Sequence, residues 1–316
     1  MSDKPLAQMV LPADPAGIAQ AAAILQGGGL VAVPTETVYG LAARADSSEA
    51  VAAIYRAKGR PDFNPLIVHV ASLEQAATLV ELDARARKLA AAFWPGALTM
   101  VLPLKPGARI APAVTAGLPT LALRCPAHPA MRALLEQSGL ALAAPSANRS
   151  GAVSPTTAAH VVASLGERAP LVLDGGVCAA GIESTIVALR DDGSWQVLRP
   201  GPVTEAQISA ILGTAAGLVT SSAIEAPGQL ASHYAPGKPV RLNATAATSD
   251  EFLIGFGALA GQANLSPGGD LAEAAARLYQ CLHQAAAAAQ PRIAVAAIPD
   301  VGIGAAINDR LRRAAA

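Results

Sequence analysis

Short apolar runs alternate along the chain with segments of helical spacing. Residues 15–26 have the spacing of a helix, three glycines at 27–29 end it, and residues 30–33 follow as a short buried strand. The same pattern predicts helices at residues 48–57 and directly after Ser72. Further strands are predicted at residues 66–70, 98–104, 120–124, 140–144, 171–173 and 184–189. Alternating strands and helices indicate an α/β protein, and the irregular connections argue against a regularly wound nucleotide-binding fold.

The composition changes after a helix predicted at residues 204–212. Residues 213–239 are rich in Ala, Gly, Ser, Thr and Pro, which is typical of a linker. Beyond them the pattern predicts a helix at 271–289, a strand at 292–298 and a last helix at 305–313. We therefore expect a large domain over residues 1–212, a linker over 213–239 and a small α/β domain over 240–316.

The composition describes an aliphatic core and a neutral protein. Hydrophobic residues make up 52% of the 316 residues but aromatic residues only 3%. Charged residues are 15%, below the roughly 25% of an average domain. Lys and Arg together number 23 and balance 23 Asp and Glu, which speaks against a globally basic nucleic-acid-binding protein.

No segment indicates a membrane span or an export signal. The longest uncharged run, between Glu205 and Glu225, contains too many polar residues for a spanning helix. No continuous apolar core follows Met1, so a signal peptide is not expected. The three cysteines are far apart and odd in number, which offers neither a disulfide framework nor a metal knuckle. We expect a cytoplasmic protein.

Common catalytic and nucleotide-binding motifs are missing. The chain contains no GxxxxGK[ST] loop, no GxGxxG after a strand, no HExxH and no GxSxG. Its candidate chemistry therefore lies in less generic segments, most of which place polar side chains at the end of an apolar run.

The first such segment is Val33–Leu41, in which Thr35, Glu36 and Thr37 follow a predicted strand. Two hydroxyls and a carboxylate at the carboxyl end of a strand are well placed to contact a ligand. The alternative is a helix N-cap formed by Thr35 or Thr37, with Glu36 in the first helical turn.

The second segment contains Lys58, Arg60 and His69. A guanidinium offers a planar donor fork for phosphate and an ammonium adds a point charge. Taken alone, the two cations equally fit a solvated basic loop. His69 lies on a predicted strand, where a hydrogen-bonded core histidine is the ordinary explanation.

Further polar residues end other apolar runs, and each is a weak signal when taken singly. Ser146 and Asn148 follow one predicted strand, and Arg124 ends another. Ser184 begins a strand, and Arg199 precedes a Pro-Gly pair.

In combination these segments resemble one family. The chain contains, in this order, PTETVYGL, K-x-R-x-x-x-NPLIVH, WPGALT, PSAN, ESTI and LRPGP. It thereby resembles the threonylcarbamoyl-AMP synthase family, and its APGQLASHYAP and GAAINDRLR segments are similar to the linker and C-terminal domain of the longer, two-domain form. The resemblance implies a YrdC-like twisted mixed sheet with helices on its faces, plus a smaller Rossmann-like α/β C-terminal domain.

The resemblance also implies a reaction and its site. L-threonine, bicarbonate or CO2 and ATP, accompanied by Mg2+, give threonylcarbamoyl-AMP and diphosphate. The implied catalytic residues are Lys58, Arg60, Ser146 and Asn148. The rest of the implied ATP site consists of Asn64, Thr115, Ser154, Arg199, His233 and Tyr234. The implied threonine site consists of Thr35, Thr37, His69, Arg124 and Ser184.

Some implied roles are more specific. Arg124 is the natural partner of the threonine carboxylate, and His233 and Tyr234 would close over the nucleotide as a lid. Family members more often carry basic residues before the His-Tyr pair, which this linker lacks, so closure would rest on these two side chains. A partner complex would then transfer the threonylcarbamoyl group to the adenosine beside the tRNA anticodon, and a weak tRNA contact of this chain is left open.

Two other functions compete with the synthase. A non-catalytic YrdC-like protein could bind RNA, although the neutral charge disfavours this interpretation. Carbamoyl transfer, as in hydrogenase-maturation proteins, is disfavoured because those longer chains carry zinc-finger-like segments and this one has three scattered cysteines.

Overall fold

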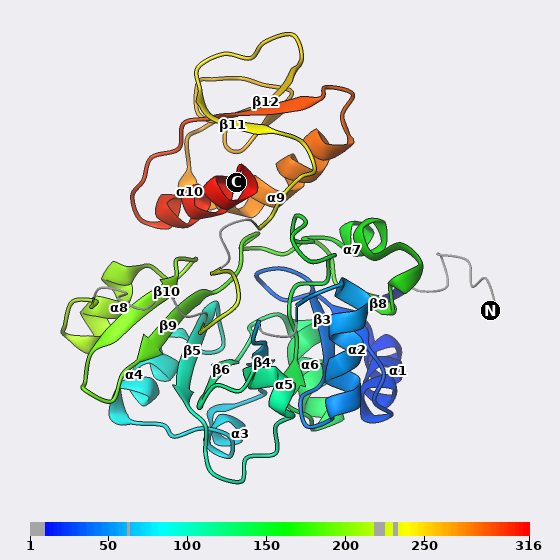
Figure 1. Cartoon of the computed structure of the whole chain (residues 1–316), viewed down its shortest axis with the longest axis vertical. Coiled ribbons are helices and arrows are strands. Elements are labelled where there is room, and N and C mark those ends of the chain that lie inside the picture. Colours follow the sequence, from blue (N-terminus) through cyan, green and yellow to red (C-terminus); the bar gives the residue numbers. More distant parts are fainter. Residues whose placement is uncertain (1–9, 62–63, 218–224, 230–232) are drawn as a thin grey trace.

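The computed structural model describes residues 10–61, 64–217, 225–229 and 233–316. It contains a large unit built on a ten-stranded mixed sheet and a smaller unit built on four parallel strands (Figure 1). This is the mixed α/β architecture expected from the sequence. Among the described residues, no helix is long and apolar enough to cross a membrane.

The ten-stranded sheet has the order β1-β8-β2-β3-β7-β4-β6-β5-β9-β10. Its strands are β1 (Val10–Pro12), β2 (Val31–Val33), β3 (Gly40–Arg44), β4 (Ile67–His69), β5 (Leu98–Pro103), β6 (Thr120–Arg124), β7 (Leu142–Ala143), β8 (Leu171–Asp174), β9 (Thr185–Leu189) and β10 (Trp195–Arg199). The helices of this unit are α1 (Pro15–Gln26), α2 (Ser48–Lys58), α3 (Leu73–Ala77), α4 (Ala84–Phe93), α5 (Pro112–Thr115), α6 (Pro129–Ser138), α7 (Ala158–Leu165), the short 3-10 helix Gly166–Arg168 and α8 (Glu205–Leu212).

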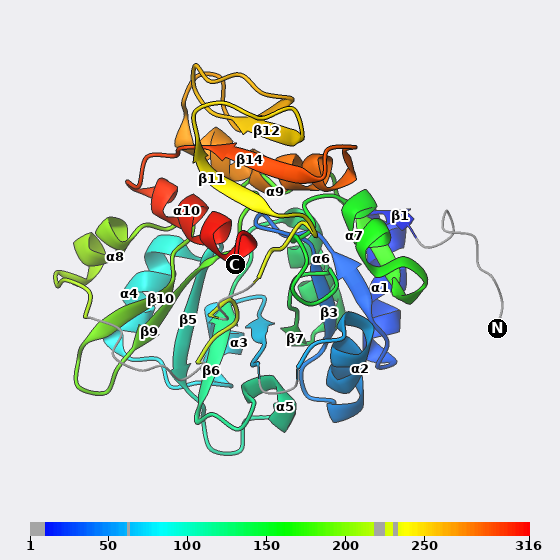
Figure 2. The same ribbon diagram turned by 45° about the horizontal axis from the view of Figure 1, so that its top comes forward.

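The small unit has the sheet order β11-β14-β12-β13. Its elements are β11 (Val240–Ala244), β12 (Glu251–Gly255), β13 (Ala263–Asn264), α9 (Leu271–Ala287), β14 (Arg292–Ala296) and α10 (Ile303–Ala314). Helices α9 and α10 lie between this sheet and the large unit in both views (Figures 1 and 2).

Most predicted elements are confirmed within one or two residues. Helix α1 ends at the first of the three glycines, and Ser72 caps α3 with a side-chain oxygen that accepts from the Gln75 N–H. The predicted strand 140–144 is shorter than expected, because only Leu142 and Ala143 pair with neighbouring strands. The predicted strand at 292–298 stops at Ala296, and the last helix begins two residues early, at Ile303.

One expectation at the start of the site is wrong. Thr35 and Thr37 do not cap a helix, because the chain turns back after β2 and pairs antiparallel with itself as β3. Thr35 Oγ1 instead bonds within the turn, to the Val38 carbonyl at 2.6 Å and to Thr37 Oγ1 at 2.8 Å. The turn therefore holds both hydroxyls at a strand end.

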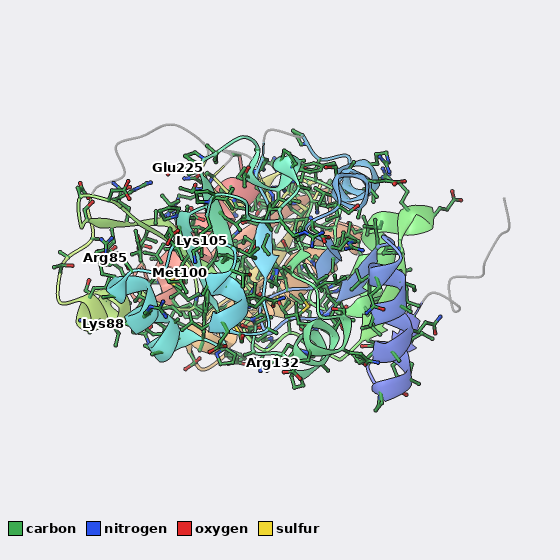
Figure 3. All side chains as sticks on the ribbon, turned by 90° about the horizontal axis from the view of Figure 1, so that it is seen from below. Arg85, Lys88, Met100, Lys105, Arg132 and Glu225 are labelled. Atoms are coloured by element: carbon green, nitrogen blue, oxygen red, sulfur yellow. The ribbon has the colours of Figure 1, made fainter. Side chains whose placement is uncertain are left out.

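Helix α4 is hydrogen-bonded to the β9–β10 hairpin at one end of the large sheet. The Arg85 guanidinium, labelled in Figure 3, donates to the carbonyls of Arg190 at 2.8 Å and Ser194 at 3.0 Å in the β9–β10 hairpin. Met100 of β5 is fully buried in the core that α4 helps to cover.

The two units share a hydrophobic core. Val38, Val153, Ile182 and Tyr234 belong to the same buried cluster as the inner faces of α9, α10 and the small sheet. The domain limits 1–212, 213–239 and 240–316 stay a prediction, and residues 218–224 and 230–232 of the predicted linker lie outside the described residues.

The two units approach each other closely at Gly181. A Cβ atom built there would lie 2.3 Å from the Ala276 carbonyl oxygen of α9, and the residue has φ +68°. Nearby, the His160 and His283 rings stack across the interface at 3.9 Å between centroids.

We expect Gly181→Ala to destabilise the protein more than Gly107→Ala. Both glycines have positive φ, so each substitution carries a backbone cost of about 1–2 kcal/mol. Only the methyl group at position 181 also overlaps α9, which adds about 1–3 kcal/mol, since nothing lies within 4 Å of the built Cβ at 107. Urea unfolding measures the difference, and equal losses would contradict the packing described.

Candidate active site

A pocket opens where several strands of the large sheet end and the linker crosses them. Of the residues predicted from the sequence, it is lined by Thr35, Thr37, Arg60, His69, Arg124, Ser146, Ser184, Arg199, His233 and Tyr234. Ile67, Glu183, Pro227 and Gly228 also line it. Many of the polar residues that line the pocket are therefore among the candidate site residues named from the sequence.

Sheet register brings His69 and Arg124 together. The two residues end the parallel strands β4 and β6 and are direct partners in the pairing. The strands consequently deliver an imidazole and a guanidinium side by side at one edge. His69 is 3% exposed, and burial lowers its pKa to about 3, so the ring is neutral.

Arg124 already holds a carboxylate, that of Glu36, which the sequence indicated only as a candidate ligand contact. Its guanidinium lies 2.5 Å from Glu36 and donates to Thr37 Oγ1 at 2.8 Å. Burial raises the pKa of Glu36, but Arg124 outweighs it and the net pKa is lowered. The ion pair orients Arg124 beside the β2–β3 turn. The pairing of Glu36 with Arg124 is visible only in the folded structure, because the two residues are far apart in the sequence.

Arg60 and Arg199 also line the pocket. Arg60 donates to the carbonyls of Asn64 and Pro65, and Arg199 donates to Ser184 and to the Pro227 carbonyl. Burial lowers the pKa of both guanidiniums, to about 10 for Arg60. Neither has a hydrogen bond or ion pair to a carboxylate among the described residues, so both favour an anionic ligand.

Lys58 lies behind this pocket rather than in its wall. Its Nζ donates to the carbonyl oxygens of Ser146 and Asn148, and burial lowers its pKa well below the ordinary value. Lys58 thereby shapes the loop that presents Ser146 to the pocket, and Asn148 is fixed beside it by bonds to the Arg149 and Ala152 carbonyls.

Three further predicted residues are near the pocket but outside its lining. Asn64 lies beside Arg60, and Thr115 ends α5 with its hydroxyl donating to the Pro112 carbonyl at 3.2 Å. Ser154 donates to Glu183 Oε1 at 2.6 Å. Their contact with a ligand stays a prediction.

The linker crosses the pocket at His233 and Tyr234. Tyr234 is 1% exposed and has φ 63°, and its ring lies 4.1 Å from that of His233 and 5.6 Å from that of Tyr279. The His233 N–H donates to the Arg313 carbonyl of α10 at 3.1 Å. The C-terminal unit thus holds these two side chains over the site.

The start of the linker is fixed to the large unit. Glu225, labelled in Figure 3, pairs with Arg190 near the end of β9, and Gly228 approaches Arg199 and Tyr234 closely. A Cβ built at Gly228 would lie 2.9 Å from Arg199 Cδ and 3.1 Å from Tyr234 Oη. The linker backbone therefore forms part of the pocket wall.

Glu183 is a second site residue that had no assigned role in the sequence. It lies in the ESTI segment, is 6% exposed and lines the pocket. Its partners come from both units, with Ser154 on one side and Tyr279 and Arg310 on the other. The sequence could not show this, because the partners lie 96 and 127 residues away.

Buried polar atoms without a hydrogen-bond partner concentrate at this pocket. Among the described residues such atoms include Arg60 Nε, Asn64 Oδ1, His69 Nδ1, His233 Nδ1 and Tyr234 Oη. Unsatisfied buried groups are costly and rare in folded proteins. Four of these residues, all except Asn64, line the one cavity, which indicates a polar ligand that supplies the partners.

The site offers no activated protein nucleophile among the cysteines. All three are buried, and burial raises the pKa of Cys178 to about 12 and that of Cys281 to about 11. Burial likewise raises the pKa of the Cys125 thiol. The arrangement is suited to binding and orienting ligands through charge and hydrogen bonds.

Two family models together match most of the chain. The Sua5/YciO/YrdC model, described as "Telomere recombination", matches residues 23–201. The model described as "Threonylcarbamoyl-AMP synthase, C-terminal domain" matches residues 203–316.

Curated relatives carry the same name. A threonylcarbamoyl-AMP synthase from Bacillus subtilis is 48% identical over 71% of this chain and 66% of its own length. One from Pyrococcus abyssi is 37% identical over 93% of this chain and 92% of its own length. The crystal structure of Pyrococcus abyssi Sua5 complexed with L-threonine superposes with a TM-score of 0.85 at 35% identity, covering 94% of each chain.

We expect the stability of the protein to fall below about pH 6.5. Burial lowers the pKa of all five histidines, so they stay neutral when folded and take up protons on unfolding. Because the unfolded chain binds more protons, the free energy of unfolding drops by up to roughly 1.4 kcal/mol per pH unit for each fully buried histidine.

Urea unfolding at about pH 7.5 and about pH 5 measures this dependence. His69→Gln should make the decline shallower, because it removes one of the two most deeply buried imidazoles. A free energy of unfolding that is equal at both pH values would contradict the neutral state of these rings.

Proposed function

The chain belongs to the threonylcarbamoyl-AMP synthase family, and from that premise we propose that it makes threonylcarbamoyl-AMP and diphosphate from L-threonine, bicarbonate or CO2 and ATP. The observation that carries this proposal is the set of buried cations and unpartnered polar atoms converging on one pocket. Threonine and ATP together supply the carboxylate and phosphates that such a pocket lacks.

Threonine fits the side formed by β2–β3, β4 and β6. Arg124 has the charge for the amino-acid carboxylate, with His69 Nδ1 free to take part in a hydrogen bond. Thr35, Thr37 and Ser184 offer hydroxyls to the remaining polar groups. Glu36 keeps Arg124 oriented, and the substrate carboxylate would share that guanidinium with it.

ATP fits the side formed by Arg60, Arg199 and Ser146. Both guanidiniums are desolvated and bonded only to neutral oxygens, so phosphate would replace weak partners with charge-assisted hydrogen bonds. Lys58 supports this side by fixing the Ser146–Asn148 loop. Asn64, Thr115, Asn148 and Ser154 complete the proposed ATP site around these three.

The chemistry is transfer of an adenylyl group, so the enzyme is proposed to be a nucleotidyltransferase. The threonine nitrogen forms a bond to the carbon of CO2 and loses a proton, and a carbamate oxygen then attacks the α-phosphorus. The bond from that phosphorus to the diphosphate oxygen breaks, and diphosphate leaves with its electron pair. Such a step needs positioning and charge neutralisation more than a protein nucleophile.

Mg2+ is proposed to enter as part of the ATP substrate. The described residues contain no group of three or more His, Cys, Asp or Glu that could hold a metal ion. The pocket carboxylates are also occupied, Glu36 by Arg124 and Glu183 by Ser154, Tyr279 and Arg310. Phosphate oxygens and water would therefore be the principal ligands of Mg2+.

The linker is proposed to act as a lid. The pocket measures about 50 Å³, far below the roughly 300–1,000 Å³ of small-molecule sites, and we propose that His233 and Tyr234 move to admit both substrates. Closure afterwards would keep water from a labile carbamate and a labile mixed anhydride.

Downstream, a transferase complex would move the threonylcarbamoyl group to the adenosine beside the tRNA anticodon, in the cytoplasm. A direct contact of this chain with tRNA stays open. A non-catalytic RNA-binding role is the competing outcome of the activity test below, because binding RNA alone leaves the unpartnered pocket atoms unexplained.

We expect diphosphate release from ATP to require both L-threonine and bicarbonate. Arg60→Ala and Lys58→Ala should each lower the rate of diphosphate release by about 10²–10³-fold. Arg60→Ala removes a positive charge from the pocket, and Lys58→Ala removes the ammonium that fixes the Ser146–Asn148 loop. Lys88→Ala, at an exposed cation of α4, is the matched control and should leave the rate unchanged. Release that ignores threonine, or wild-type rates in Arg60→Ala, would overturn the proposal.

We expect Tyr234→Ala to raise the KM for ATP about tenfold, corresponding to the loss of one buried contact of about 1.4 kcal/mol. Tyr234→Phe keeps the ring over the pocket, so its KM for ATP should be much closer to that of the wild type. Steady-state kinetics at saturating threonine separates the two variants. Full activity and unchanged nucleotide affinity in Tyr234→Ala would rule out the lid.

A further inference from the structure

A carboxylate lines the pocket in which the proposed function places ATP. Glu183 precedes Ser184, is 6% exposed and belongs to the same wall as Arg199 and Ser146. A negative charge there would repel the phosphates of a nucleotide, and its effect would be large because the site is desolvated. The charge must therefore be compensated from outside the pocket.

The compensation comes from the C-terminal unit. Arg310 of α10 is fully buried, and its Nε donates to Glu183 Oε2 at 3.0 Å. Tyr279 of α9 donates to the same oxygen at 2.7 Å, and Ser154 donates to the other oxygen at 2.6 Å. Both helices face the large unit in the two ribbon views (Figures 1 and 2).

Arg310 also reaches the linker. Its guanidinium carbon lies 5.6 Å from the centroid of the Tyr234 ring, within the range of a cation–π contact. One side chain of the C-terminal unit thus contacts both the pocket carboxylate and a residue that crosses the pocket. It does not itself line the cavity.

We propose that Arg310 is a positioning residue of the synthase site, which neutralises Glu183 from behind and so keeps the nucleotide side of the pocket attractive to ATP phosphates. This inference rests on the proposed function. It gives the C-terminal unit a chemical part in catalysis, although none of its residues lines the pocket.

The electrostatics agree with the geometry. Burial raises the pKa of Glu183, but Arg310, Arg199 and the hydrogen bonds from Ser154 and Tyr279 together outweigh it and bring the pKa down to about 2. The carboxylate is therefore ionised and paired throughout the working range. The titratable or charged groups that face it from the packed elements include Arg199 of β10, His233 and Tyr234 of the linker, Tyr279 of α9 and Arg310 of α10. Arg310 also pairs with Asp309 of the same helix at 2.8 Å.

The test is the pH dependence of the KM for ATP in Arg310→Met, measured by threonine-dependent diphosphate release. Without Arg310, burial raises the pKa of Glu183, and the group ionises as the pH increases through the new value. The KM for ATP should then rise with pH to about tenfold above wild type near pH 8, while the KM for threonine changes less. The wild-type KM should show no such titration.

The second variant removes the unpaired charge. Arg310→Met combined with Glu183→Gln should abolish the rise, because glutamine keeps an acceptor for Ser154 or Tyr279 without a negative charge. Arg310→Lys, which keeps the positive charge, should stay near wild type. Arg312→Met, at an exposed arginine of the same helix, is the matched control and should have no effect.

Two results would overturn the inference. One is an increase in the KM for ATP of Arg310→Met that is the same at every pH and is not reversed by Glu183→Gln, which is what a purely structural role predicts. The other is an unchanged KM for ATP in Arg310→Met. Should Arg310→Met not fold, Arg310→Gln, which keeps a donor but lacks the charge, carries the same test.

The experiment separates this inference from the proposed function. If wild-type protein releases no diphosphate with threonine and bicarbonate, the proposed function fails. The inference is then decided by calorimetric ATP binding in the same variants at the same pH values. A pH-dependent loss of affinity that Glu183→Gln reverses supports it, and a pH-independent one overturns it.

Discussion

Buried positive charge without a hydrogen-bonded carboxylate partner is the constraint on which the site depends. Lys58, Arg60 and Arg199 are nearly or fully buried, and in the described part of the chain their hydrogen bonds go only to neutral oxygens. Burying cations in this way is costly, and burial lowers the pKa of each. An anionic ligand recovers that cost on binding. In the proposed function the ATP phosphates supply that anion, and preorganised charge of this kind is the form in which electrostatic catalysis is most effective.

Each of the two carboxylates near the pocket is paired with a further arginine. Glu36 orients Arg124 on the side proposed for threonine, and Glu183 is neutralised by Arg310 across the domain interface. The shared core around Tyr234, Ile182 and α9 packs the two units together at that interface. The C-terminal unit is therefore part of the electrostatic environment of the pocket.

Local patterns predicted the strands and showed which polar residues end them, while the roles of those residues rested on the resemblance to the family and stay predictions. His69 and Arg124 are examples, and sheet register places them side by side. Glu183 and Arg310 could not be paired in advance, since 127 residues separate them and each alone fits an ordinary surface position. The β2–β3 turn was ambiguous because Thr-Glu-Thr suits a helix cap as well as a hairpin, and only the antiparallel pairing with β3 decides between them. The contact of Lys58 with the phosphates stays a prediction, and in the structure its ammonium donates to the carbonyls of the neighbouring loop.

The synthase reaction is tested most directly by following the bicarbonate carbon into the product. Purified protein is incubated with ATP, L-threonine and 13C-labelled bicarbonate, and the nucleotides are analysed by mass spectrometry. The account predicts an AMP adduct that contains threonine and one 13C atom, formed only when all three substrates are present. ATP that stays intact, or AMP that appears without the labelled adduct in folded protein, would contradict it.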